Sequence, residues 1–174
     1  LKPGLELWRG ASGTVLHEPG EAVSHAYFPC GASLISFVVL LSDGKAIEAA
    51  LVGREGAAGG IVSQGHLPAF ARAEVQNEGM FLRILLKDLE EAKSRSISLR
   101  HMFVRYADCL MAEIMQSVAC NAAHSIEQRT ARWLLTAVEL SGSQEIALTQ
   151  DQLSTMLGIG RSYLTRVLSS TLYD

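Results

Sequence analysis

The stretch LTQDQLSTMLGIGRSYLTRVL runs from Leu148 to Leu168 and contains two short amphipathic runs separated by Gly158. Thr149 and Gln152 have the spacing of a capping box, which predicts that a helix begins here. A glycine at position 158 can adopt the left-handed conformation that ends a helix. About three residues join the two predicted helices, which is the geometry of a helix-turn-helix. Their predicted buried face consists of Leu153, Met156, Leu157, Leu164, Val167 and Leu168.

The second predicted helix carries polar side chains where a DNA-reading helix contacts base edges. Arg161 and Ser162 lie in its first turn, and Ser162 shares a face with Arg166, four residues later. An arginine fork can bind guanine O6 and N7. Further contacts to phosphate or bases are expected from Gln150, Tyr163 and Thr165. A helical hairpin with ordinary surface arginines has the same spacing, so the motif by itself leaves both interpretations open.

The first half of the chain has a different pattern. Short apolar runs such as SLISFVVLL and AIEAALVG lie between closely spaced glycines, which is typical of strands separated by turns. Asp43-Gly44 joins two of these runs and is a strong signal for a two-residue hairpin. Many short strands at regular spacing predict a barrel or a two-sheet roll.

Residues 98–123 predict one long helix, about 40 Å in length at about 1.5 Å per residue. Such a helix exposes more apolar surface than a small roll can cover, so we expect it to pair with a second copy of itself. The residues expected in this dimer seam, from their heptad spacing, are Phe103, Leu110, Ile114 and Ser117, and Met111, Met115 and Val118 are expected to widen the apolar stripe. Packing wholly within one chain is the alternative. His124 marks a break, and Ser125 with Gln128 predicts a capping box for the next helix.

Composition narrows the class of protein. The chain has 174 residues, 48% of them hydrophobic, and a net charge of −3, so any binding to DNA must depend on local charge. Three cysteines without CxxC spacing do not support a disulfide framework or a zinc site, and favour a reducing, cytoplasmic setting. The longest apolar run has nine residues, too few to cross a membrane, and we find no secretion signal.

An enzyme is not expected. The sequence contains no His-x-His metal motif, no GxSxG elbow and no GxxxxGK[ST] phosphate loop. The histidines are scattered along the chain, which gives no reason to expect a metal or haem site, and they are His17, His25, His66, His101 and His124.

Four motifs in order resemble the Crp/Fnr family of bacterial transcription regulators. ALTQDQLSTMLGIGRSYLTRVL is similar to the family's helix-turn-helix, and SVACNAAHSIEQRTARWLL to the end of its dimerisation helix and the helix that follows. LSDGKAIEAALVGREGAAG and FARAEVQ, with HEPGE and AYFP before them, resemble its cyclic-nucleotide-binding-like β-roll. The resemblance implies an α+β protein with a jelly-roll-like sensor domain at 1–97, a dimerisation helix at 98–123 and a DNA-binding domain at 124–174.

The resemblance also implies partners. A homodimer would read a two-fold symmetric double-stranded DNA site, with Arg161, Ser162 and Arg166 at the base-contacting positions, and RNA polymerase is a further partner that the family allows. The family often has an acidic residue where Ser162 stands, so its usual half-site sequence is not expected. The family continues past this helix into a winged hairpin, whereas this chain ends at Asp174. A sensing or assembly module that does not bind DNA in this form is therefore the alternative.

The effector pocket is the least defined part of the resemblance. Members that bind cyclic nucleotide use a Gly-Glu pair and a later Arg-Ser or Arg-Thr pair. The comparable positions here are Gly56, Gly59, Arg72 and Ala73, so the hydroxyl expected after the arginine is missing. A cyclic nucleotide, another small ligand, and a roll kept only for its structure all remain open. The effector would act by shifting the spacing of the two recognition helices. Oxidation of Cys109 or Cys120 on the long helix is a further hypothetical signal.

Overall fold

A computed structural model describes residues 4–61 and 67–171 of the chain. Three parts of the predictions lie outside these ranges: His66, residues 1–3 of the predicted sensor domain and residues 172–174 of the predicted DNA-binding domain. The chain forms strands first and helices afterwards, which confirms the α+β prediction.

The strands form two antiparallel sheets that make up the predicted roll. One sheet has the order β1-β7-β3 and the other β2-β6-β4-β5, so distant parts of the sequence pair. The strands are β1 (Glu6–Gly10), β2 (Val15–His17), β3 (His25–Pro29), β4 (Leu34–Leu40), β5 (Ala46–Val52), β6 (Arg72–Asn77) and β7 (Gly79–Leu85).

The hairpin between β4 and β5 is longer than predicted. Residues 41–45 connect the strands, so the two-residue turn expected from Asp43-Gly44 is wrong. Gly44 does have a left-handed conformation, with φ of 83°. The Leu41 amide donates to the Lys45 carbonyl at 2.8 Å, so three residues, 42–44, lie between this hydrogen-bonded pair instead of two.

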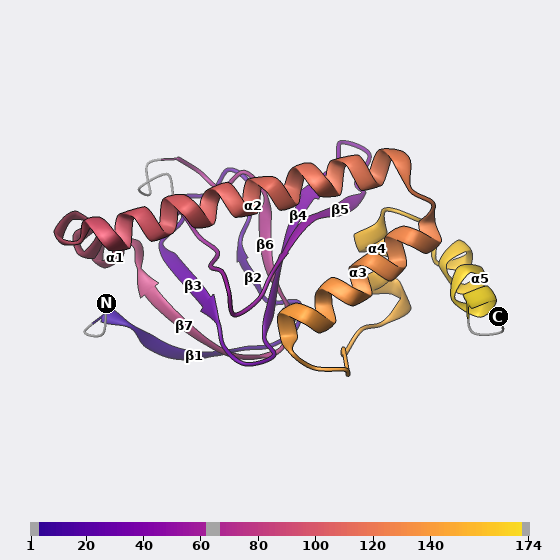
Figure 1. Ribbon diagram of the computed structural model, residues 1–174, viewed down its shortest axis with the longest axis horizontal. Helices are drawn as coiled ribbons and strands as arrows, with labels where there is room; N and C mark the ends of the chain where they lie inside the picture. Colours follow the sequence, from indigo (N-terminus) through magenta and orange to yellow (C-terminus); the bar gives the residue numbers. More distant parts are fainter. Residues whose placement is uncertain (1–3, 62–66, 172–174) are drawn as a thin grey trace.

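Two helices follow the roll. The first, α1 (Leu86–Arg95), begins directly after β7 and was not distinguished in the sequence. The second, α2 (Ile97–Ala123), confirms the predicted long helix, with Ser96 capping its start and His124 at its end. Figure 1 shows α2 running along the whole roll and reaching the helical part of the chain.

Three shorter helices complete the chain: α3 (Ile126–Ser141), α4 (Gln150–Leu157) and α5 (Arg161–Thr171). Both predicted capping boxes are present, at Ser125 with Gln128 and at Thr149 with Gln152. Each pairs two amides that the first helical turn would otherwise leave without a partner. Local hydrogen bonds therefore determine where α3 and α4 begin.

The hydrophobic core joins the helical part to the roll. One cluster combines Leu34 of β4 and Leu51 of β5 with Trp133 of α3 and with buried residues of α4 and α5. The division into domains at 97/98 and 123/124 stays a prediction, because this shared core crosses it. None of the helices described is both long and apolar enough to cross a membrane.

Candidate nucleic-acid interface

The turn between α4 and α5 is fixed by Gly158. Its φ is 66°, a left-handed conformation, and its amide donates to the carbonyls of Ser154 and Thr155. The Ile159 amide donates to the Ser154 carbonyl at 3.0 Å. These bonds pair the carbonyls at the end of α4 and turn the chain into α5. The predicted helix end at this glycine is confirmed.

One side of α5 is anchored in the core and the other side is free. Leu164 is fully buried and Val167 is 4% exposed, in agreement with the predicted buried face. Since the helix is held by this apolar side, its polar side chains point away from the core. The exposed residues of its first two turns are Arg161, Ser162, Tyr163, Thr165 and Arg166.

The polar residues at this surface form few contacts. Arg161 pairs with Asp151 at 3.2 Å, both side chains being exposed. Thr165 donates to the Gln150 Oε1 at 3.1 Å, which joins α5 to the start of α4. The Arg166 guanidinium lies 5.3 Å from the centre of the Tyr163 ring. Because no carboxylate lies within 4.0 Å of Arg166 among the residues described, its fork of donors can bind a ligand without first breaking an ion pair.

The structure therefore brings the six predicted DNA-binding residues to one exposed surface, made by the start of α4 and the first two turns of α5. Their contact with DNA stays a prediction. The sequence did not indicate that Asp151 would pair with Arg161, since that contact depends on how the two helices cross.

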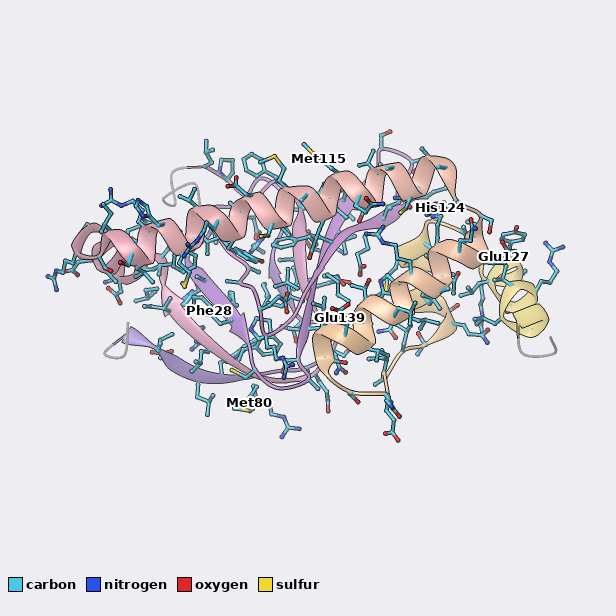
Figure 2. The ribbon with its side chains drawn as sticks, in the orientation of Figure 1. Phe28, Met80, Met115, His124, Glu127 and Glu139 are labelled. Atoms are coloured by element: carbon cyan, nitrogen blue, oxygen red, sulfur yellow. The ribbon has the colours of Figure 1, made fainter. Side chains whose placement is uncertain are left out.

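A second exposed surface lies on α2. Four large apolar side chains recur at intervals of seven residues, with exposed fractions of 64%, 51%, 50% and 64%, and they are Ile97, Val104, Met111 and Val118. Met115 belongs to the same surface and is 63% exposed. Figure 2 shows Met115 pointing away from the roll. We refer to these five residues as the α2 stripe.

The predicted dimer-seam residues do not form this stripe. Phe103 is 4% exposed and packs inside the chain, with its ring centre 6.3 Å from that of Phe28. Leu110 packs against the core of the roll, and Ser117 accepts a hydrogen bond from Arg132 at 3.4 Å. Ile114 is the most exposed of the four, at 36%. Both sides of α2 are apolar, and the heptad pattern centred the predicted seam on the side that faces the roll. The residues expected to widen it, Met111, Met115 and Val118, do belong to the α2 stripe.

The predicted effector residues are largely occupied by contacts within the chain. Arg72 forms two hydrogen bonds of 2.9 Å with Glu18, and Ala73 is completely buried in the core. An anion at Arg72 would have to compete with the Glu18 carboxylate. Gly59 has a φ of 100°, and a Cβ there would lie 2.2 Å from the His25 carbonyl oxygen. A glycine is therefore required at this position by the backbone conformation and by the close approach of His25.

Gly56 lies against Tyr106 of α2. A Cβ at Gly56 would be 2.6 Å from the Tyr106 hydroxyl, which donates to the Ala57 carbonyl at 2.9 Å. Burial raises the pKa of Tyr106 to about 12, so this hydroxyl stays a donor at neutral pH. The contact fills the space beside Gly56 and ties the long helix to this loop of the roll.

A polar link between the roll and α3 was missed in the sequence. The Glu48 carboxylate, on β5, accepts hydrogen bonds of 2.6 Å from the Ser36 hydroxyl and from the Trp133 Nε1. Burial raises the pKa of Glu48 to about 7, and the charge of Glu74 adds to this, against the lowering effect of the two donors. A lone glutamate within the apolar run AIEAALV is the signal that could have identified it.

No metal site is apparent among residues 4–61 and 67–171, where His, Cys, Asp and Glu do not form groups of three or more that could hold an ion. Cys109 is exposed and Cys120 is buried, so the two predicted redox candidates lie in different surroundings.

No protein-family model and no curated protein matches this chain. Solved structures do match over nearly its whole length. FixK2 from Bradyrhizobium japonicum has a TM-score of 0.79 and 14% identity, over 97% of this chain and 84% of FixK2. TTHB099, a CRP-family transcriptional regulator from Thermus thermophilus, has a TM-score of 0.77 and 18% identity, over 95% of this chain and 84% of its own. TTHA1359, a CRP/FNR-family transcriptional regulator from the same organism, has a TM-score of 0.75 and 19% identity, over 96% of this chain and 86% of its own.

The chain therefore has the Crp/Fnr fold, a β-roll followed by a long helix and a helical domain, as the sequence motifs predicted. Its similarity to these regulators is one of fold.

Proposed function

We propose that this chain is a Crp/Fnr-type transcription regulator that reads double-stranded DNA through α5. The observation that carries the proposal is the exposed surface of α5, where Ser162 and Arg166 share a face and Arg166 has no competing carboxylate among the described residues. The N-terminal half of a recognition helix contacts base edges in the major groove, and these residues occupy that half. The chain's net charge of −3 makes this local arrangement necessary for binding.

The regulator acts as a homodimer through the α2 stripe. Four of its members recur with the seven-residue spacing of a coiled-coil seam. All five side chains are at least 50% exposed, so a single copy of the chain would leave this apolar surface in contact with water. Two copies paired along α2 would place two copies of α5 on one side of the dimer, which suits a two-fold symmetric operator. No catalytic role is proposed, in keeping with the regulators whose fold it shares.

The test is a selection of bound sequences from a random DNA library, carried out with the full chain and with Arg166→Ala. The proposal expects a symmetric sequence to be enriched, and expects Arg166→Ala to lose discrimination at one base pair of each half-site by about 1–3 kcal/mol. Arg105→Ala, an exposed arginine on α2, is the matched control and should leave the sequence unchanged. Without an enriched symmetric sequence, the sensing or assembly module that does not bind DNA becomes the better account.

A further inference from the structure

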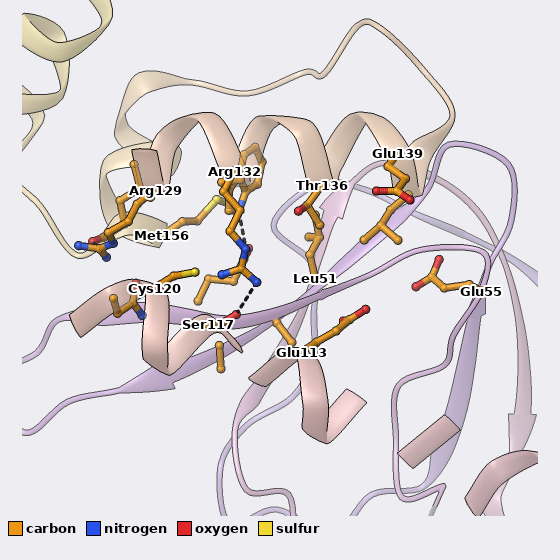
Figure 3. Close-up of a pocket in the computed structure, with 17 residues that line it drawn as sticks. Leu51, Glu55, Glu113, Ser117, Cys120, Arg129, Arg132, Thr136, Glu139 and Met156 are labelled. Atoms are coloured by element: carbon orange, nitrogen blue, oxygen red, sulfur yellow. Dashed lines mark hydrogen bonds between the residues drawn. The ribbon is translucent and has the colours of Figure 1, made fainter. Parts of the chain in front are cut away.

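A cavity of about 350 Å³ lies where the roll, α2, α3 and α4 meet. Its walls include Leu51 of β5, Glu113 and Cys120 of α2, Arg132 of α3 and Met156 of α4. It is separate from the predicted effector position, since Gly56, Gly59, Arg72 and Ala73 are not among its lining residues. Figure 3 shows the side chains that surround it.

The cavity has cationic groups on one wall. Arg129 and Arg132 lie one turn apart on α3 and both line it. Arg132 donates to the Ser117 hydroxyl at 3.4 Å, and Arg129 donates to the Leu157 carbonyl at 2.8 Å. A guanidinium has five N–H donors, so these contacts leave most of them unused. In addition, the buried Nε of Arg129 has no hydrogen-bond partner within the described part of the chain.

Four glutamates also line the cavity. Glu55, Glu113 and Glu139 lie away from Arg129 in Figure 3. Glu48 is the fourth, and its carboxylate already accepts hydrogen bonds from Ser36 and Trp133. Burial raises the pKa of Glu113, the nearby charge of Glu55 raises it further, and Arg132 lowers it. Glu113 and Arg132 are therefore close enough to interact electrostatically. Within residues 4–61 and 67–171, however, no ion pair of 4.0 Å or less joins an arginine of this cavity to one of its glutamates.

The separated opposite charges indicate which kind of ligand the cavity can bind. A ligand with only an anionic group would be repelled by the carboxylates, and a ligand with only an amine would be repelled by the guanidiniums. A molecule with an anionic group at one end and an ammonium at the other would pair with both walls, and its chain would contact Leu51 and Met156.

We infer that this cavity is a binding site for a small elongated zwitterion, of the ω-amino acid class. Arg132 would hold the anionic end and Glu113 the ammonium end. Because the walls come from the roll, the long helix and the helices that carry α5, an occupant would fix α3 and α4 against α2. The zwitterion would be the signal of the proposed regulator, so its regulatory role rests on the proposed function. Binding of the zwitterion itself can be measured without DNA.

The test uses 6-aminohexanoate, with hexanoate and hexylamine as analogues that each lack one charge. Trp133 lines the cavity, and Trp8→Phe leaves it as the single tryptophan, so its fluorescence reports occupancy. We expect 6-aminohexanoate to bind at least about tenfold more tightly than either analogue, the effect of one charged hydrogen-bonded pair. Equal binding of all three compounds would overturn the inference.

Variants locate the site. Arg132→Gln and Glu113→Gln should each weaken 6-aminohexanoate binding about tenfold, whereas Arg105→Gln and Glu145→Gln, at exposed positions, should not. A loss no greater than that of these controls would contradict the assignment. The unsubstituted chain provides an independent measurement, because Cys120 lines the cavity and Cys109 is exposed. 6-Aminohexanoate should slow alkylation of Cys120 and leave that of Cys109 unaffected, and an unchanged rate of alkylation at Cys120 would also overturn the inference.

Discussion

Glu48 offers a sharp test of the link between the roll and the helical domain. Its carboxylate accepts hydrogen bonds from Ser36 and Trp133 but lies in partly buried surroundings that raise its pKa from 4.5 to about 7. The folded chain therefore holds this proton more tightly than the unfolded chain does. The resulting stabilisation is fully present below pH 4.5 and is lost as the pH rises through about 7.

The magnitude follows from the two pKa values. Their separation corresponds to about 3 kcal/mol, and solvent at this partly exposed side chain reduces the measurable effect to about 1–3 kcal/mol. Glu48→Gln has the shape of the protonated acid, and its amide can still accept from the indole and donate to the Ser36 oxygen. The variant should match the natural chain at about pH 4 and exceed its free energy of unfolding by about 1–3 kcal/mol at about pH 8.

Urea unfolding followed by circular dichroism at the two pH values measures this difference. Glu145→Gln, at an exposed position, is the control and should change the free energy of unfolding equally at both. The reasoning is refuted if Glu48→Gln is as unstable as Glu48→Ala at the higher pH, because the carboxylate would then be needed in its charged form.

Two further substitutions test other parts of the structure. Gly158→Ala should destabilise the helix-turn-helix by about 1–2 kcal/mol, because φ is 66° and a Cβ would lie 3.2 Å from Ile47; thermal unfolding checks this, and an unchanged midpoint would argue against the left-handed turn. Met111→Glu combined with Val118→Glu should convert the proposed dimer to a monomer in sedimentation at micromolar concentration, while Gln144→Glu, exposed and outside α2, should not. A double variant that remains dimeric would place the dimer contact elsewhere.

Local signals predicted the order of the elements well. Ser125 with Gln128, Thr149 with Gln152, and Gly158 each determine a helix boundary through bonds to residues at most four positions away. The roll was also predictable in kind, from the glycine-bounded apolar runs. The length of the β4–β5 loop was not, because Asp43-Gly44 is compatible with a longer connection once the flanking strands end earlier.

Which face of a helix meets which partner was harder to predict. Phe103 and Val104 are adjacent and both apolar, yet Phe103 is 4% exposed and Val104 51%. To predict which of the two side chains is buried, one needs to know where the roll lies. The periodicity of apolar residues along α2 does not give that information. The Glu48–Trp133 bond and the cavity between the roll and the helices likewise join residues far apart in the sequence, and only the packing of α3 on β5 brings them together.

The most direct test of the central claim, that α5 enters the major groove as one of a symmetric pair, is cleavage of DNA from a tethered reagent. A chain with Ser162→Cys and its three natural cysteines replaced would carry an iron chelate at position 162 and be bound to the selected sequence. The account predicts two symmetric zones of cleavage separated by about one helical turn, roughly 34–36 Å. A single zone, or cleavage spread evenly along the DNA, would contradict it.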